Sequence, residues 1–225
     1  MNTIDAILNR KSVRQMIPDK EVSKEKIKEL LKIATKTASW TNSQPWEVFV
    51  LSGDYVEKFN EAWREEMADG IPDSGPDLTF PHRQEWQQYK RYPDNVIGIG
   101  ASRKNWAKEN GIGEEEWNNM TFESLKNNYF APAILILGLH ESATTCSNFD
   151  LGSFSTNFML AAEEKGYSTI VAASIIFFAD RIREIIDVPD DIKLVIGIGY
   201  ADEDHPLNQP EAPRNSTDEF TRFFD

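Results

Sequence analysis

Seven consecutive apolar residues, AILILGL, run from Ala133 to Leu139. A strand with one face in water alternates apolar and polar residues, so an unbroken apolar run of this length is typical of a strand covered on both faces. Residues 193–200, KLVIGIGY, and residues 46–51, WEVFVL, also have the composition of strands, and a short strand is expected over 169–174. The chain is therefore expected to have a central sheet with a layer on each side.

Helical patterns surround these strands. Ser23 is a plausible N-cap for a helix that runs to about residue 36, with its apolar residues spaced to form one buried stripe. Gly166 is placed to end a helix that starts at Asp150. Further helices are expected over 3–9, 54–68 and 180–186. Because strands and helices do not alternate regularly, the pattern favours an α+β sandwich around one sheet.

Two segments do not fit this regular pattern. Residues 69–118 hold four prolines and three of the six tryptophans, which is too aromatic for a disordered linker and too broken for regular sheet. We expect an irregular excursion with short helices that either packs over a ligand, as a lid would, or has a small core of its own. The tail, residues 201–225, has no core pattern before Phe220, Phe223 and Phe224. It either frays or wraps a partner, and we favour wrapping.

The distribution of charge indicates an anion site. With 24 Lys and Arg against 37 Asp and Glu, the chain carries a net charge of −13, which argues against general nucleic-acid binding. Residues 1–40, however, hold nine basic and five acidic residues, a net charge of +4. Arg10, Lys11 and Arg14 lie within five residues of one another, so this basic segment is expected to hold an anion.

The lengths of the apolar runs indicate whether the chain could cross a membrane, and the number of cysteines indicates its compartment. The longest run, residues 170–179, has ten residues, whereas a membrane span needs roughly 20. The N-terminus lacks the basic-then-apolar order of a signal peptide. Cys146 is the single cysteine, which excludes an internal disulfide. We expect a cytoplasmic protein without a membrane anchor, in which Cys146 is a buried, inert thiol.

Several common catalytic motifs are missing from the sequence. A dinucleotide fingerprint, Gly-x-Gly-x-x-Gly, starting at Gly98 would need glycine at position 103, which is Arg103. The same fingerprint starting at Gly197 would need glycine at position 202, which is Asp202. The three histidines are far apart in the sequence, so no metal site is expected. No nucleophile motif is present. If the protein is an enzyme, its chemistry is expected to come from a cofactor.

Two short motifs become informative when they are taken together. Arg10-Lys-Ser12-Val-Arg14 follows the first helix, and Ser39 with Asn42-Ser-Gln44-Pro-Trp46 precedes the first strand. Each alone fits a solvated turn. In this order they resemble the flavin-dependent nitroreductase family, whose members have an Arg-x-Ser-x-Arg turn and a Ser-x-x-Asn-x-Gln-Pro-Trp loop. Residues 150–166 resemble the family's dimer-interface helix, and the tail, with Pro206, Asn208 and Arg214, is most similar to the nitrobenzoate-reductase-like branch.

The resemblance implies one α+β domain over residues 1–225, with a mostly antiparallel sheet flanked by helices. It also implies a homodimer that binds FMN at its interface and a C-terminal arm, residues 201–225, that extends onto the partner. Arg10 and Arg214 would hold the phosphate with help from Ser12, and Arg14 would lie near the flavin pyrimidine edge. The full set of expected cofactor-binding residues is Arg10, Lys11, Ser12, Arg14, Ser39, Trp40, Asn42, Gln44, Ala173, Ser174 and Arg214.

Some of these positions have particular roles or depart from the family pattern. Ser39, Asn42 and Gln44 would reach the flavin from the partner, and the backbone of Ala173 and Ser174 would face flavin N5. Trp40 stands where the family usually has a small residue, so it would alter the wall of the pocket. The arm often carries two basic residues, but Ala212 replaces the first of them here.

The activity implied by the resemblance is reduction of nitroaromatics, quinones or similar electron-poor small molecules. NADH or NADPH would reduce the flavin in the first half of a ping-pong cycle. No side chain need act as an acid or base, so no catalytic residue is assigned. Two alternatives stay open: reductive dehalogenation or dehydrogenation on the same flavin, suggested by the Trp-rich segment, and a non-catalytic flavin-binding dimer, suggested by Trp40.

Overall fold

A single antiparallel sheet organises the chain. The computed structural model describes residues 2–68, 70, 91–188 and 191–224. In that part of the chain four strands pair in the order β1-β2-β4-β3, and every neighbouring pair is antiparallel. The strands are β1 (Trp46–Ser52), β2 (Ala133–Leu139), β3 (Ser168–Val171) and β4 (Asp191–Gly199). This confirms the expected α+β fold with an antiparallel sheet.

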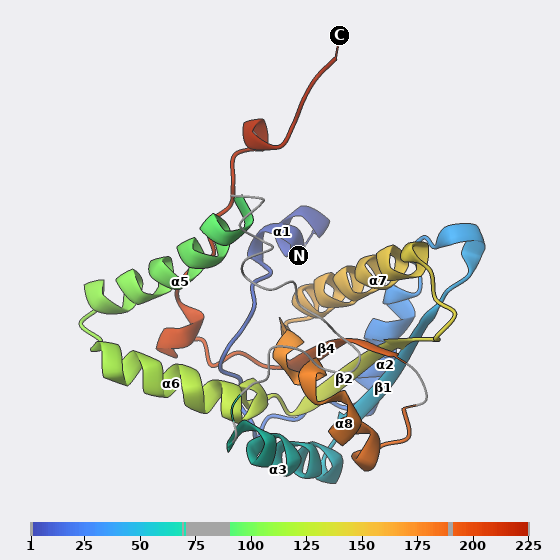
Figure 1. Ribbon diagram of the computed structural model, residues 1–225, viewed down its shortest axis with the longest axis horizontal. Coiled ribbons are helices and arrows are strands. Elements are labelled where there is room, and N and C mark those ends of the chain that lie inside the picture. The colour runs from blue at the N-terminus through green and yellow to red at the C-terminus, as the bar shows by residue number, and fades with distance from the viewer. Residues whose placement is uncertain (1, 69, 71–90, 189–190, 225) are drawn as a thin grey trace.

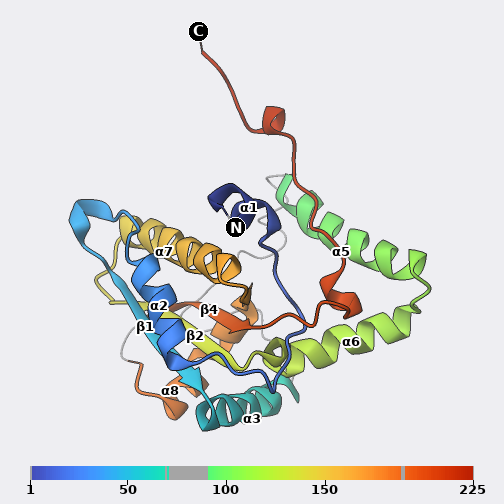
Figure 2. The same cartoon turned by 180° about the vertical axis from the view of Figure 1, so that it is seen from behind.

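Seven α-helices in the described residues surround the sheet (Figures 1 and 2). They are α1 (Thr3–Asn9), α2 (Lys24–Ala34), α3 (Asp54–Ala68), α5 (Arg91–Glu109), α6 (Glu114–Lys126), α7 (Thr145–Glu164) and α8 (Ala179–Ile185). Helices α2 and α7 cover one face of the sheet, and α3 and α8 cover the other. Helices α5 and α6 contact each other and diverge from the short loop that joins them, as a V to one side of this sandwich (Figure 1).

Strand β2 shows why the sheet has two covered faces. All seven of its residues are buried. Its odd-numbered residues, such as Leu135 and Leu137, pack in the core beneath α2 and α7. Ile134 and Ile136 point to the opposite face and pack beneath α3 and α8, since successive side chains of a strand alternate. Burial of each of these side chains contributes about 1.5–3 kcal/mol, so the expected double coverage of this strand is confirmed.

Helix ends follow local capping chemistry. The Ser23 hydroxyl accepts the N–H of Lys26 at 3.4 Å, which caps α2 as expected. Gly166 has φ +79° directly after the C-cap of α7, a conformation that glycine adopts without steric cost. Helix α3 has the expected bounds, and α2 ends two residues before the expected position.

Three expectations about residues 145–178 were wrong in detail. Helix α7 starts at Thr145 rather than Asp150, because Thr144 and Ser147 form a reciprocal capping box. Cys146 consequently lies in the first turn of α7 and is exposed, not buried. The strand expected over 169–174 ends at Val171, and a 3-10 segment, Ala173–Phe178, follows it.

The Trp-rich segment is more regular than expected. Of residues 69–118, residues 69 and 71–90 lie outside the described residues. The remainder includes α5, a helix of 19 residues rather than short helices; Pro93 fits because it lies in the first turn, where no intrahelical N–H bond is needed. Trp106 and Trp117 pack with Leu207 in a small core, their ring centroids 6.3 Å apart. The described part therefore has a small core of its own.

The tail is buried near its start and exposed at its end. Leu207 and Asn208 are buried, whereas Phe220, Phe223 and Phe224 are exposed. From about residue 214 the chain leads away from the body towards the C-terminus (Figures 1 and 2). Among the described residues, none of the helices is long and apolar enough to cross a membrane. The cytoplasmic location stays a prediction.

Candidate functional site

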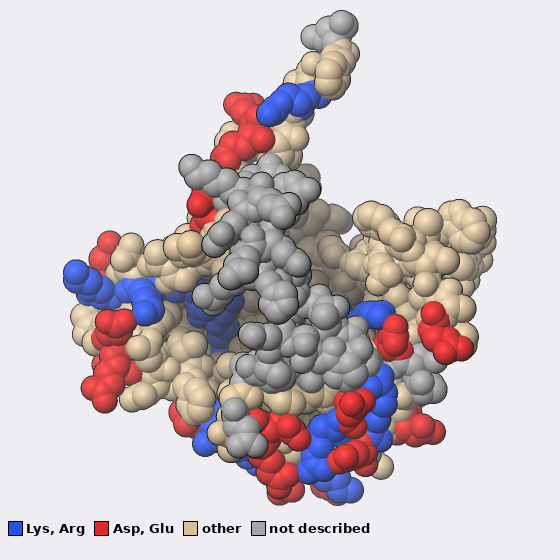
Figure 3. Space-filling view, viewed as in Figure 1, with Lys and Arg blue, Asp and Glu red and all other residues tan. Residues whose placement is uncertain are grey.

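A basic cleft lies where the end of α1, the 10–14 turn, α5 and the tail meet. Its volume is about 510 Å³, and its wall is formed by Ile7, Leu8, Asn9, Arg10, Lys11, Ser12, Arg14, Ile99, Arg103, Pro210, Glu211, Ala212 and Arg214. Five of these residues are basic and one is acidic, so the wall carries a net charge of +4 in a chain whose net charge is −13. Figure 3 shows recessed Lys and Arg side chains beside α5. Local charge of this size is suited to an anion.

The basic turn is held in place by the buried side chain of Asn208. Its Oδ1 accepts the backbone N–H groups of Arg14 and Gln15 at 2.7 and 3.1 Å, and its Nδ2 donates to the Gln15 carbonyl at 2.7 Å. The Lys11 ammonium donates to the Asn208 carbonyl at 2.6 Å. On its other side the turn bonds to β3, where the Val13 N–H donates to the Thr169 carbonyl at 3.1 Å. The tail and the sheet thus fix the position of the cations.

Arg14 and Arg103 form the more buried part of this cleft. Burial lowers the pKa of Arg14. Burial, and then the charge of Arg14, lower the pKa of Arg103 to about 10. The Tyr129 phenol opposes both shifts. The two guanidinium groups are therefore close enough to repel each other in a poorly solvated site, and an anion bound between them would relieve that repulsion.

The cations of the cleft are not paired with carboxylates in the part of the chain that the structure describes. Among the described residues, no carboxylate forms an ion pair with Arg10, Lys11, Arg14, Arg103 or Arg214. Arg14 Nη1 donates to the Ser12 carbonyl at 3.1 Å. The Nη2 atom of Arg103 is buried without any hydrogen-bond partner, and its guanidinium carbon lies 5.7 Å from the centre of the Trp117 ring. Unpartnered buried donors of this kind are rare and indicate a ligand.

The structure brings together five of the expected cofactor-binding residues: Arg10, Lys11, Ser12, Arg14 and Arg214. It adds Arg103, which the sequence analysis had considered only as a break in a glycine motif. The signal that could have identified it is a single arginine after the apolar and small residues 96–102 of the Trp-rich segment. Only the packing of α5 against the 10–14 turn shows that this arginine belongs to the site.

A second group of expected residues lies away from the cleft of its own chain. Ser39, Trp40, Asn42 and Gln44 belong to the loop between α2 and β1 and are absent from the cleft wall. Trp40 is 62% exposed, and its backbone N–H donates to Asp150 Oδ2 at 3.0 Å. Thr41, Asn42 and Gln44 have φ of 49°, 61° and 48°, a left-handed conformation that costs about 1–2 kcal/mol per residue. Such local strain is common where a loop serves binding.

Ala173 and Ser174 also lie outside the cleft wall. They start the 3-10 segment after β3. The backbone N–H groups at the start of a helical turn have no partner within that turn, so these two positions can offer donors.

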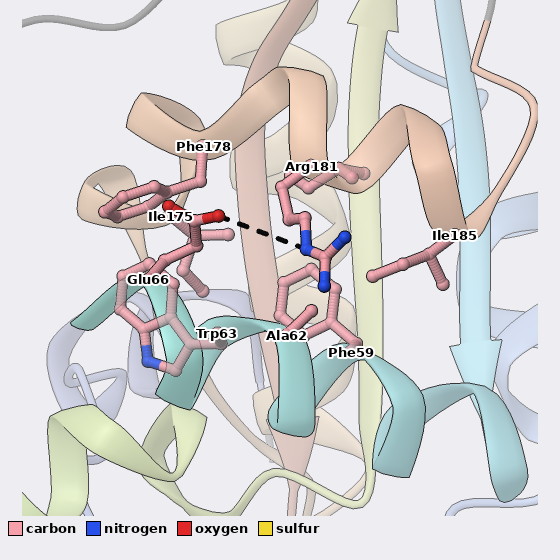
Figure 4. Close-up of a pocket in the computed structure, with 9 residues that line it drawn as sticks. Phe59, Ala62, Trp63, Glu66, Ile175, Phe178, Arg181 and Ile185 are labelled. Atoms are coloured by element: carbon pink, nitrogen blue, oxygen red, sulfur yellow. Dashed lines mark ion pairs between the residues drawn. The ribbon is translucent and has the colours of Figure 1, made fainter. Parts of the chain in front are cut away.

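Another hollow, between α3 and α8, is a packing seam (Figure 4). Its open volume is about 10 Å³, which is room for one water molecule at most. Trp63 and Phe59 of α3 face Phe178 and Ile185 of the opposite segment, and Arg181 Nε lies 4.0 Å from Glu66 Oε1 at the rim. In the described part of the chain, no group of three His, Cys, Asp or Glu side chains is arranged to hold a metal ion.

Comparisons with known proteins agree with this geometry. A model of the nitroreductase family matches residues 7–200. The chain is 26% identical to a 4-nitrobenzoate reductase of Pseudomonas putida, over 97% of this chain and 94% of that protein. It is 26% identical to a nitrobenzene nitroreductase of Ectopseudomonas oleovorans, over 98% and 96%. The crystal structure of the FMN-dependent nitroreductase NfnB from Mycobacterium smegmatis in complex with NADPH has a TM-score of 0.82 at 24% identity, covering 99% and 97% of the two chains.

Proposed function

The chain belongs to the nitroreductase family, and we propose that it is an FMN-dependent oxidoreductase that uses NADH or NADPH to reduce nitroaromatics or similar electron-poor molecules. The single observation that carries this proposal is the cleft, which is lined by five described cationic side chains and one carboxylate. The flavin phosphate carries close to two negative charges, so a protein with a net charge of −13 needs such a concentration of cations to bind it.

The outer part of the cleft fits the phosphate. Lys11 and Arg214 are exposed and Arg10 is half-buried, so all three can contact a dianion that keeps some of its water. The planar guanidinium groups of Arg10 and Arg214 can donate two parallel hydrogen bonds to phosphate oxygens. The Ser12 hydroxyl can add a further donor. The donor set of this chain therefore fits FMN.

The inner part of the cleft fits the flavin ring. When bound, FMN supplies the redox chemistry, because it takes up a hydride from NAD(P)H and gives the electrons to the acceptor. Arg14 is fixed by Asn208 and partly desolvated, so its charge is already in place to stabilise negative charge at the pyrimidine edge. The backbone N–H groups of Ala173 and Ser174 would meet flavin N5.

We further propose a homodimer, in which each cleft is completed by the partner. The Ser39–Gln44 loop, residues 39–44, carries Ser39, Asn42 and Gln44 but lies away from its own cleft, as expected if it serves the other subunit. Leu8 and Phe149 are 75% and 74% exposed, and Trp40 bonds to Asp150, next to Phe149. Large exposed apolar side chains on two helices that contact each other, α1 and α7, are typical of an interface. The exposed phenylalanines of the tail would contact the same partner.

Titration of flavin-free protein with FMN, followed by flavin fluorescence, tests this function. The account predicts saturable binding and NAD(P)H oxidation that accelerates when nitrobenzene is added. Arg10→Gln should weaken FMN binding about 10- to 100-fold, since a hydrogen bond to a charged group contributes about 1.5–3 kcal/mol. Lys28→Gln removes an exposed charge on α2 and is the control. Absence of FMN binding would overturn the proposal.

A further inference from the structure

We propose that Arg103, together with Arg14, binds a carboxylate group on the electron acceptor, so that this protein favours nitroaromatic acids over neutral nitroaromatics. The inference rests on the proposed function, because it assigns a substrate class to the same cleft. The relatives do not decide the question, since they include reductases of 4-nitrobenzoate and of nitrobenzene.

Counted over the described residues that line it, the cleft carries more positive charge than FMN alone requires. Its wall has a net charge of +4, and the phosphate neutralises about two of these charges. Reduction of the flavin adds at most one more negative charge. About one positive charge is then left without a counter-ion, and it lies in the less solvated part of the cleft, where an unpaired charge is most costly. A monoanionic group on a second ligand would complete the balance.

Arg103 is the cation that this group would meet. Its Nη2 atom is buried and has no hydrogen-bond partner, and no described carboxylate pairs with it. Among the described residues of the cleft wall, Glu211 is the one acidic residue, and it forms no ion pair with Arg103. Arg103 thus lines the cleft with a charge that no described carboxylate neutralises through an ion pair.

The contact of Arg103 with Trp117 suits recognition of a planar anion. The guanidinium lies over the buried ring of Trp117, with 5.7 Å between the guanidinium carbon and the ring centre. A cation–π contact of this length supports the guanidinium from one side, and a guanidinium presents a planar edge of N–H donors. A carboxylate fits such an edge with two parallel hydrogen bonds, whereas a neutral ring substituent cannot. Arg14, whose charge acts on Arg103, reinforces the attraction.

The test compares two unreactive ligands of nearly equal shape, benzoate and benzamide, on the FMN-loaded protein. Their dissociation constants are measured from the change in flavin absorbance at neutral pH and low salt. The proposal predicts that benzoate binds at least tenfold more tightly than benzamide. In Arg103→Gln this preference should disappear. Arg103→Lys keeps the charge but lacks the paired N–H donors of the guanidinium, so it should retain part of the preference.

The matched control is Lys104→Gln. Lys104 is the next residue of α5, and it is exposed and paired with Glu114 at 2.9 Å outside the cleft. This variant removes the same charge from the same helix and should keep the wild-type preference.

Kinetics with 4-nitrobenzoate and nitrobenzene provide the second readout. The proposal predicts that Arg103→Gln raises KM for 4-nitrobenzoate at least tenfold and leaves KM for nitrobenzene within twofold. An equal rise in KM for both acceptors would overturn the proposal, because Arg103 would then act on the flavin itself. Equal affinity of the wild-type protein for benzoate and benzamide would also overturn it, whether or not the variants fold. Protein that cannot bind FMN would instead overturn the proposed function.

Discussion

The side-chain oxygen of Asn208 accepts the backbone N–H of Arg14, and the two atoms are 2.7 Å apart. These residues are 194 positions apart in the chain, yet this contact joins the two segments that supply most of the cations of the cleft. Asn208 is 3% exposed, and its amide also bonds to the backbone of Gln15 and Asp202. A single buried amide therefore fixes the tail to the basic turn.

Replacement of this amide should destabilise the protein. In Asn208→Ala several buried backbone groups lose their partners, and each such loss costs about 1–3 kcal/mol. We expect the free energy of unfolding in urea to fall by about 2–4 kcal/mol, with weaker FMN binding. Asn215→Ala, a more exposed asparagine of the same tail, should change it by less than about 0.5 kcal/mol. Equal effects of the two substitutions would contradict this role of Asn208.

The sequence predicted the sheet well because the relevant signal is local. Strand β2 has the bounds that its apolar run indicated, and Gly166 ends α7 as expected. The start of α7 was missed because the Thr144–Ser147 capping box begins the helix before Asp150, the start that the sequence analysis expected.

The site was predicted only in part. Arg10, Lys11, Ser12 and Arg14 are adjacent in sequence, so a short motif identified them. Arg103 comes from a helix that begins 77 residues after Arg14, and only tertiary packing brings them together. The position of the 39–44 loop away from its own cleft agrees with the expectation that Ser39, Asn42 and Gln44 serve the partner, but that expectation came from the family resemblance and not from the residues of the loop themselves.

Removal of the Arg103 charge should stabilise the flavin-free protein. The pKa of Arg103 in the folded protein, about 10, lies below its ordinary value because of burial and the charge of Arg14. The unfolded chain therefore binds the proton more strongly, so the charge opposes folding at every pH below 10, and this effect fades as pH rises from there towards the ordinary pKa of arginine.

At pH 7, Arg103→Met should raise the melting temperature of flavin-free protein by roughly 2–4 °C, which corresponds to about 1 kcal/mol in a domain of this size. The methionine keeps much of the contact with Trp117. Lys104→Met serves as the control and should not stabilise. A lower melting temperature for Arg103→Met would show that the guanidinium stabilises the flavin-free fold, and would contradict the prediction that its charge is unfavourable without a ligand.

Acid should weaken the tail through His205. Its Nδ1 accepts the N–H of Leu207 at 3.3 Å, and burial lowers the pKa of this imidazole, with Asp202 opposing the shift. The folded state therefore favours the neutral imidazole. The contribution of His205 to the free energy of unfolding is complete above the ordinary pKa of 6.5 and is lost as pH falls from there towards the lowered pKa.

His205→Asn keeps a capping acceptor that does not titrate. Between pH 7 and pH 5, its free energy of unfolding should therefore fall less than that of the wild-type protein, as measured in urea at both pH values. Identical losses in the two proteins would rule out His205 as the source.

The proposed dimer makes a separate prediction. Phe149→Glu places a charge on an exposed apolar position of α7, where burial against a partner would leave it unpaired at a cost of several kcal/mol. Light scattering after size-exclusion chromatography should show a monomer that has lost FMN. Phe122→Glu, at a half-exposed position of α6, should remain dimeric. A dimeric Phe149→Glu protein would place the interface elsewhere.

The visible absorbance spectrum of the purified protein, recorded without oxygen before and after addition of NADPH or NADH, tests the central claim most directly. The account predicts a yellow protein whose flavin absorbance bleaches with at least one of the two nucleotides and returns when a nitroaromatic acceptor is added. A protein that stays colourless after incubation with FMN, or a bound flavin that neither nucleotide reduces, would contradict it.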